Sequence, residues 1–202
     1  MIDEFRAAFG PIDLPGTPQA PPPLWEEARV VGYRDIMTAF AGATCQNGLY
    51  RLHTAASAAE AERCVTQAFP RYRDRLVCVG VDWLGRQYAL NRRRPHPADP
   101  NEPLLLSFDP EADGADPEPT TFAGFHAGAG VESCSRERWR AWSAANPTQC
   151  PLAHADCVGL RIPLFLGGSD TPTNMAIVNT AAYWRAIVSQ LRYLAEMPPL
   201  TD

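Results

Sequence analysis

The sequence predicts an α+β fold with a mostly antiparallel central sheet and with helices packed before, between and after its strands. Apolar residues at 75–81 and 86–90 flank a tight turn, which is typical of a β-hairpin, and a third apolar stretch at 103–108 follows. Other segments, including 135–145, repeat apolar residues at helical spacing. Helical patterns precede, separate and follow the expected strands, and this order favours the α+β class.

We expect a single domain over residues 1–202. A chain of this length with 46% apolar residues can bury one well-developed core. A body of strands and helices at 41–202 follows an N-terminal part, 1–40, that combines a helix with a Pro-rich strap. The sequence leaves the oligomeric state open.

The N-terminal part predicts two short helices. Residues 2–9 place Ile2, Phe5 and Phe9 on one side, and Gly10 and the proline after it end this helix. Six prolines between residues 11 and 23 then fix an extended strap across the surface. Residues 33–40 form the second helix.

The middle of the chain begins with a turn at Asn47-Gly48 and an alternating strand at 49–53. Ser57 and Glu60 then have the spacing of a capping box, in which a hydroxyl and a carboxylate satisfy the free N–H groups of a helix start. The apolar face of this helix is expected to consist of Ala58, Ala61, Val65, Ala68 and Phe69.

Two charged segments are expected to be loops. Arg92-Arg93-Arg94 precedes a Pro-His-Pro sequence, and three charges in a turn favour a solvated loop. Residues 109–119 hold five acids and three prolines with no bulky apolar residue. The helix at 135–145 then carries Trp139 and Trp142 toward the interior.

The most distinctive segment is the apolar run Cys157–Ser169, which ends in a Gly pair before a polar turn. No acid or nucleophile lies inside the run, between Cys157 and Ser169, so it indicates a shaped surface more than a site of chemistry. A Gly pair in this position lets the backbone turn tightly or approach another segment closely. The amphipathic helix that follows displays Trp184, Ile187, Val188, Leu191 and Leu194.

The composition favours some classes of function over others. A net charge of −5 and a pI near 5.4 argue against a nucleic-acid surface and favour a basic protein partner. The first residues lack the apolar region of a secretory signal, and no run approaches the ~18 apolar residues of a membrane span. We therefore expect a cytoplasmic protein that binds no membrane and no nucleic acid, with its six cysteines reduced.

Cys150, His154 and Cys157 are the best candidates for chemistry, because two thiolates and an imidazole at short spacing could begin a zinc site. A fourth ligand would have to come from Cys134 or His126, and the sequence has no Cys-x-x-Cys pair. Cys150 and His154 could alternatively act as nucleophile and base. Ordinary packed cysteines are the competing interpretation, and we assign no metal, no cofactor and no catalytic residue.

The last quarter of the chain resembles a known family. Gly159–Asp170, together with Asn174, Tyr183-Trp184 and the last helix, is similar to the C-terminal domain of bacterial immunity proteins that protect against type VI secretion DNase effectors. In that domain a Gly- and Pro-containing segment ends in a Gly pair and is followed by a helix. The resemblance extends backward through Asp82–Gln87 and the strand at 104–108.

Residues 1–40 resemble, more loosely, the GAD-like N-terminal part of the same proteins, here shortened and rich in proline. The family resemblance implies a protein partner, with no catalytic residue and no cofactor. It implies that the chain is an immunity protein that binds a cognate secreted antibacterial toxin, a nuclease effector, and neutralises it by occluding the active site.

Acidic side chains and one aromatic anchor are the expected contacts with such a basic toxin, because complementary charge speeds encounter and buried anchors hold a complex. Trp83 has an alternative interpretation as a core residue. The partner-binding candidates are Asp82, Trp83, Asp109, Glu111, Asp113, Asp116 and Glu118. Two other functions remain open: a small cysteine-dependent hydrolase or transferase, and a SUKH-like interaction module whose partner is not a toxin.

Overall fold

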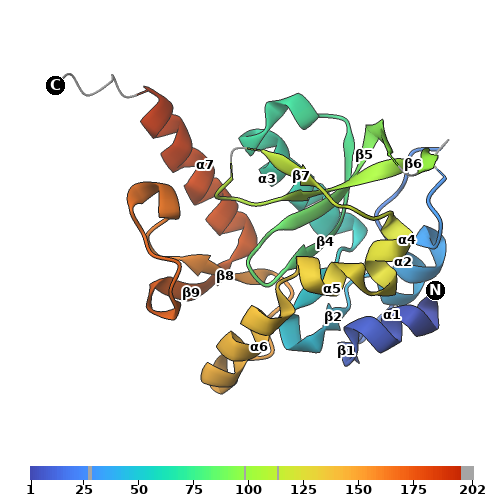
Figure 1. Ribbon diagram of the computed structural model, residues 1–202, viewed down its shortest axis with the longest axis horizontal. Coiled ribbons are helices and arrows are strands. Elements are labelled where there is room, and N and C mark those ends of the chain that lie inside the picture. Colours follow the sequence, from blue (N-terminus) through green and yellow to red (C-terminus); the bar gives the residue numbers. More distant parts are fainter. Residues whose placement is uncertain (27–28, 98, 113, 197–202) are drawn as a thin grey trace.

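A seven-stranded antiparallel sheet forms the centre of the protein (Figure 1). The computed structural model describes residues 1–26, 29–97, 99–112 and 114–196. Each strand pairs with the next along the chain, in the order β1 (Ile12–Asp13), β2 (Thr44–Cys45), β3 (Tyr50–Leu52), β4 (Leu76–Asp82), β5 (Gln87–His96), β6 (Asp99–Phe108) and β7 (Ala115–Pro117). A second antiparallel sheet pairs β8 (Asp156–Leu160) with β9 (Met175–Asn179).

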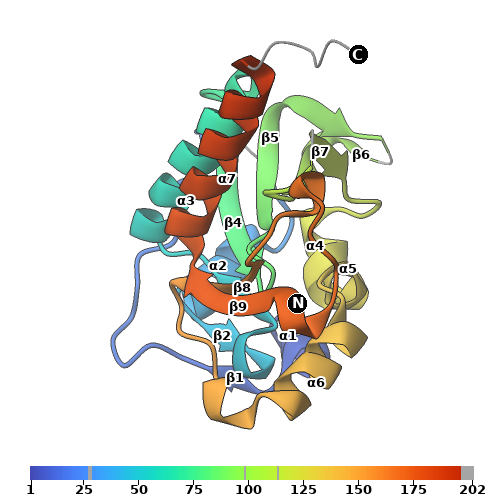
Figure 2. The same cartoon turned by 90° about the vertical axis from the view of Figure 1, so that its left-hand side faces the viewer.

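Helices lie before, between and after the strands, which confirms the α+β fold. Figure 2 shows α3 and α7 side by side along one face of the sheet, and the other helices pack near its opposite face and lower end. The helices are α1 (Ile2–Phe9), α2 (Tyr33–Phe40), α3 (Ala55–Ala68), α4 (Phe122–Gly124), α5 (Gly130–Ser133), α6 (Arg136–Ala145) and α7 (Thr180–Glu196).

The central strands are buried on both faces, so each contributes to two apolar cores. On β5, Tyr88 and Leu90 enter the core under α1 and α2, whereas Ala89 enters the core under α3 and α7. On β6, Leu105 and Leu104 divide in the same way. This division follows from the two-residue period of a strand, which places neighbouring side chains on opposite faces.

The N-terminal helices belong to the first core. Phe5 and Phe9 are fully buried and stack with ring centroids 4.9 Å apart, and Phe9 also contacts Tyr50 at 5.3 Å. Phe5 reaches Phe40 of α2 at 4.8 Å, which joins the two helices. The predicted bounds of both helices are confirmed, although Ile2, expected on the same side as Phe5, is 37% exposed.

Trp184 of α7 anchors the second core. Its ring is fully buried and meets Phe69 edge-on at 6.4 Å, and its Nε1–H donates to the carbonyl of Gly85 at 2.8 Å. Ile187 and Val188 are also buried, as predicted from the helical spacing. The side chain of Leu194 lies outside the described part of the chain.

Helix α3 begins earlier than its sequence pattern predicts. Thr54 is the N-cap, and its Oγ1 accepts from the N–H of Ser57 at 3.1 Å while the Ser57 Oγ accepts from the Thr54 N–H at 2.9 Å. The expected pair of Ser57 and Glu60 is therefore replaced by a pair three residues upstream. The predicted apolar face is confirmed at Ala58 and Val65, which are buried.

Both segments expected to be loops contain strand residues. The Arg92-Arg93-Arg94 run continues β5 beyond the body of the sheet, with an irregular register against β6, and its side chains are exposed. Residues 115–117 of the acidic segment pair with β6 as the edge strand β7. Backbone pairing with the long strand β6 stabilises both segments despite their polar composition.

The small sheet is joined to the large one by buried groups. The N–H of Val158 on β8 donates to the carbonyl of Trp83 at 2.7 Å. Arg51 is fully buried on β3, and its guanidinium donates to the carbonyls of Asp82 (2.5 Å) and Ala153 (3.3 Å). Within the described residues, no helix is both long enough and apolar enough to cross a membrane.

Candidate protein-docking surface

The loop between β8 and β9 displays three large apolar side chains. Ile162, Leu164 and Leu166 are 54%, 46% and 45% exposed, and the last two belong to one short 3₁₀ turn, Leu164–Leu166. Pro163 lies at the start of this turn. A proline inside an apolar run interrupts strand pairing, so the residues after it leave the sheet although their composition is that of a strand.

The Gly pair fixes the shape of this loop. Gly167 ends the turn with a φ of +84°, a conformation that favours glycine. Gly168 lies against the backbone of Ile162, where a Cβ atom would come within 1.8 Å of the Ile162 carbonyl oxygen. Both roles expected of the Gly pair, a tight turn and a close approach, are present.

Asn174 ties the two ends of the loop together from inside. Its Oδ1 accepts from the N–H of Ile162 at 3.0 Å, and its Nδ2 donates to the carbonyls of Ile162 (2.8 Å) and Ser169 (2.9 Å). The side chain is only 8% exposed. These bonds hold the exposed leucines on a preorganised frame, which reduces the entropy lost when a partner binds.

Glu111 connects the acidic segment to this loop. One carboxylate oxygen accepts from the N–H of Leu164 at 2.8 Å, and the other accepts a short hydrogen bond from the hydroxyl of Tyr183. The Tyr183 oxygen in turn accepts from the N–H of Leu160 at 3.1 Å. Burial, followed by the bond to Glu111, raises the pKa of the Tyr183 hydroxyl, so Tyr183 remains a donor.

A groove with a volume of about 240 Å³ lies between this loop and the acidic segment. Its apolar lining includes Leu84, Leu160 and Leu164, and its charged lining consists of three acids and one arginine. The charged side chains are Asp109, Glu111, Arg138 and Asp170. Apolar and acidic groups therefore meet on one continuous surface.

The structure brings only some of the predicted partner-binding residues to this surface. Asp109 and Glu111 line the groove and are half-buried, whereas Asp116 is exposed on β7. Asp113 lies outside the described residues. Glu118 is buried at 6% exposure and accepts from the Ser133 hydroxyl at 2.8 Å, so its carboxylate holds α5 and is not part of an open surface.

Trp83 and Asp82 are corrected from partner contacts to core residues. Trp83 is fully buried, packs against Trp139 with centroids 5.5 Å apart and donates from Nε1 to the Cys134 carbonyl at 3.0 Å. The carboxylate of Asp82 is also fully buried and pairs with Arg86 at 2.7 Å. The turn that looked like an exposed anchor is covered by α6 and β8, which come from distant parts of the sequence.

The three residues considered for zinc lie in different surroundings. Cys150 is half-buried against the first core, the Nε2–H of His154 donates to the carbonyl of Leu52 at 2.9 Å, and Cys157 is buried beside Tyr183. In the described part of the chain, no three His, Cys, Asp or Glu side chains are grouped so as to hold a metal ion.

Nucleophilic chemistry at Cys150 receives no support from its environment. Burial raises the pKa of the Cys150 thiol, whereas a cysteine nucleophile needs a lowered pKa to form its thiolate. Burial also lowers the pKa of His154. All six cysteines are free thiols in the structure, and the five others are buried.

A second cavity, of about 80 Å³, lies between α3 and the start of α7. His53 and Gln87 line it, with the His53 Nε2–H donating to Gln87 Oε1 at 2.8 Å and His53 Nδ1 accepting from the Ser57 hydroxyl at 3.0 Å. Burial lowers the pKa of His53 to about 3. An imidazole this resistant to protonation is a poor general base, so we interpret the cluster as a satisfied polar core.

The sequence analysis interpreted the apolar run as a shaped surface but did not name Ile162, Leu164, Leu166 or Asp170 as partner contacts. The signal that could have identified Leu164 and Leu166 is Pro163, because a proline removes the apolar residues that follow it from strand pairing. Ile162 precedes the proline and had no such signal. Asp170 had no local signal. Its proximity to Asp109 depends on the packing of two segments about 60 residues apart in sequence.

Comparisons with known proteins bear on the fold alone. No protein-family model matches the chain, and no curated protein matches it significantly. Among solved structures, that of Atu4351 from Agrobacterium tumefaciens is similar, with a TM-score of 0.61 at 13% sequence identity over 93% of this chain and 88% of that chain. At this identity the two chains share a fold, and function has to be argued from the site.

Proposed function

We propose that this chain is an immunity protein that binds a basic secreted toxin, a nuclease effector, and blocks its active site. The observation that carries the proposal is the rigid loop on which Ile162, Leu164 and Leu166 are about half exposed beside an acidic groove. Clustered exposed apolar side chains rimmed by polar groups mark protein-binding surfaces. The family resemblance of this same segment supports a toxin as the partner.

The charges of the surface suit a nuclease. Nuclease active sites are cationic because they bind phosphates, and complementary charge speeds association and fixes orientation. Asp109 and Asp116 keep their place in this proposal as electrostatic contacts, with Leu164 and Leu166 as the apolar anchors in place of Trp83. Glu111 acts indirectly, because both of its carboxylate oxygens hold the loop.

Co-expression tests the proposal. Each reading frame that flanks the gene is expressed with and without this chain, and the expected result is that one frame is toxic and that this chain restores growth and co-purifies with its product. In the variant Leu164→Asp with Leu166→Asp, affinity for that product should fall by about 10- to 100-fold, because two anchors are replaced by charges. A control is Val31→Asp, which places the same charge at an exposed apolar residue just before α2.

The outcomes separate the alternatives. Loss of binding in the loop variant but not in the Val31 variant supports the docking surface. Capture of a partner without rescue of growth would favour the SUKH-like interaction module with a non-toxin partner. If no flanking product is captured or neutralised, the immunity function is rejected.

A further inference from the structure

The groove beside the docking loop combines an apolar lining with excess negative charge. Among the described residues, Leu84, Val158 and Leu160 line it together with three carboxylates and one cationic side chain, that of Arg138. The groove therefore offers aliphatic contacts close to acidic groups. An arginine side chain has the matching distribution, with an apolar stem and a planar cation at its end.

Asp109 can accept further hydrogen bonds in this groove. Its Oδ1 accepts from the backbone N–H of Glu111 at 2.9 Å. Its Oδ2 has no hydrogen-bond partner among the residues that the structure describes. Glu111, in contrast, uses both oxygens on Leu164 and Tyr183. An incoming cation would thus be received by Asp109, with Asp170 on another wall of the same groove.

The protein already places one guanidinium in this groove. Arg138 of α6 pairs with Asp170 through a short contact, and its guanidinium carbon lies 5.6 Å from the ring centroid of Trp83. Both side chains of this pair are partly exposed, at 38% and 51%. Because Arg138 contacts both the Asp170 carboxylate and the Trp83 ring, the groove already accommodates a guanidinium group.

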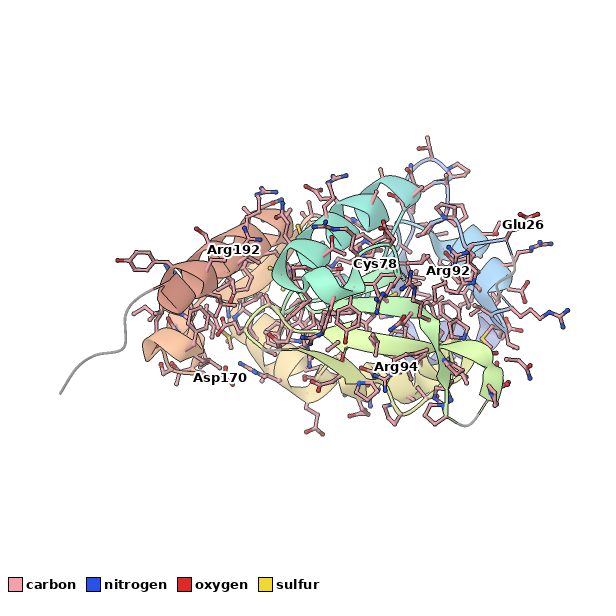
Figure 3. All side chains as sticks on the ribbon, turned by 90° about the horizontal axis from the view of Figure 1, so that it is seen from above. Glu26, Cys78, Arg92, Arg94, Asp170 and Arg192 are labelled. Atoms are coloured by element: carbon pink, nitrogen blue, oxygen red, sulfur yellow. The ribbon has the colours of Figure 1, made fainter. Side chains whose placement is uncertain are left out.

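In Figure 3, Arg92 and Arg94 of β5 lie away from Asp170, one of the charged residues that line the groove. Asp170 lies toward the end of the molecule that carries α7, whereas Arg92 and Arg94 lie away from it on the β5–β6 side. Among the described residues that line the groove, Arg138 is the one that carries a positive charge.

We infer that this groove is a socket for an arginine side chain of the partner, whose guanidinium binds Asp109 while its stem contacts Leu84 and Leu164. The inference rests on the proposed function, in that the arginine is supplied by the bound toxin. The inference adds to the proposed function the chemical group that this surface would bind, a guanidinium. Hydrogen bonds between a guanidinium and a carboxylate are among the stronger ones in proteins because they are charge-assisted.

The test is a titration of the full ¹⁵N-labelled chain with Nα-acetyl-arginine amide, monitored by NMR. Saturable shifts are expected at the amides of Glu111, Leu164 and Gly167, with a dissociation constant on the order of 1 mM, as suits a single side chain. Nα-acetyl-citrulline amide, which has the same shape without the charge, should bind at least about fivefold more weakly.

Asp109→Asn is the decisive variant. It keeps an oxygen acceptor for the Glu111 N–H and removes the charge, so the loop should stay folded while arginine affinity falls at least about fivefold. Asp35→Asn, which removes an exposed carboxylate from α2 and outside the groove, should leave affinity for the arginine amide unchanged. Equal binding of arginine and citrulline, or full binding by Asp109→Asn, would overturn the inference.

Failure of this inference is distinguishable from failure of the proposed function. If the arginine amide does not bind but toxin capture still depends on Leu164 and Leu166, the groove is not an arginine socket and the immunity proposal stands. If the amide binds at the groove and no toxin is captured, the socket is real and its partner belongs to another class of protein.

Discussion

At the scale of single residues, burial separates the side chains that stabilise this fold from those available to a partner. Trp83 is fully buried and hydrogen-bonded, whereas Leu164 is 46% exposed and makes its hydrogen bonds only through its backbone. Both are large apolar residues beside the same groove region. Substitution of Trp83 should therefore change the free energy of unfolding, whereas substitution of Leu164 should change the affinity for a partner.

Trp83→Phe should destabilise the protein by about 2 kcal/mol, because it removes the bond to the buried Cys134 carbonyl and leaves unfilled volume. Its affinity for the toxin should stay within about twofold, since Trp83 lies beneath the surface. The charged variant Leu164→Asp should show the reverse pattern, with stability changed by less than about 0.5 kcal/mol. Urea denaturation and calorimetric titration measure the two quantities. A large loss of affinity in a folded Trp83→Phe protein would return Trp83 to the interface.

At the scale of elements, the sequence pattern predicted the bounds of two helices correctly but misplaced the capping residues of a third. The helices at residues 2–9 and 33–40 were predictable because apolar periodicity and a following Gly or Pro act within one or two turns. The start of α3 was misplaced because two overlapping polar pairs both fit a capping pattern. Thr54 is the N-cap because the chain turns into the helix two residues after β3, and only the tertiary structure fixes that position.

The capping assignment can be tested by comparing two single substitutions. Thr54→Ala should destabilise the protein by about 1 kcal/mol, because it removes the acceptor for the Ser57 N–H. Glu60→Ala should change stability by less than about 0.5 kcal/mol, since the Glu60 side chain is half exposed and its one ion pair, to Arg185, is 3.9 Å long. Urea denaturation of both variants gives the comparison. Equal losses would favour the downstream pair.

The docking surface was less predictable than the helices for a physical reason. Sequence pattern reports local backbone preference, and the groove is made by segments that come together only in the fold. Asp109 was identified from local charge density, whereas Asp170 and Arg138 gave no local sign of their shared site. The prediction that Asp82 and Trp83 contact a partner was wrong for the same reason. The elements that bury these residues, β8 and α6, lie more than 50 residues downstream.

At the scale of the whole molecule, three histidines on both sides of the sheet are held neutral by the fold. Burial lowers the pKa of His53 to about 3 and that of His126 to about 4, and it also lowers the pKa of His154. Each donates one N–H to a side-chain or backbone carbonyl oxygen, namely that of Gln87, Phe122 or Leu52. A neutral imidazole fits these partners, and protonation would place a charge in the core.

Acidification should therefore destabilise the protein before most carboxylates titrate. Because the folded pKa of His53 lies below the unfolded value of 6.5, the unfolded chain binds the proton first, and stability falls as the pH drops from about 6.5 toward 3. Between pH 7.5 and 5.5 the contribution of one such histidine is about 1.4 kcal/mol. Urea denaturation at the two pH values measures this loss.

His53→Gln isolates the contribution of one histidine from those of the carboxylates. Burial raises the pKa of Glu62 and Glu102, and protonation of these groups in the folded state opposes the histidine effect in both proteins equally. The variant should be less stable at pH 7.5, because it loses the bonds to Gln87 and Ser57, but its further loss on going to pH 5.5 should be smaller by about 1.4 kcal/mol. An identical pH dependence in the two proteins would mean that His53 takes up its proton at the same pH in the folded and the unfolded chain, which its burial makes unfavourable.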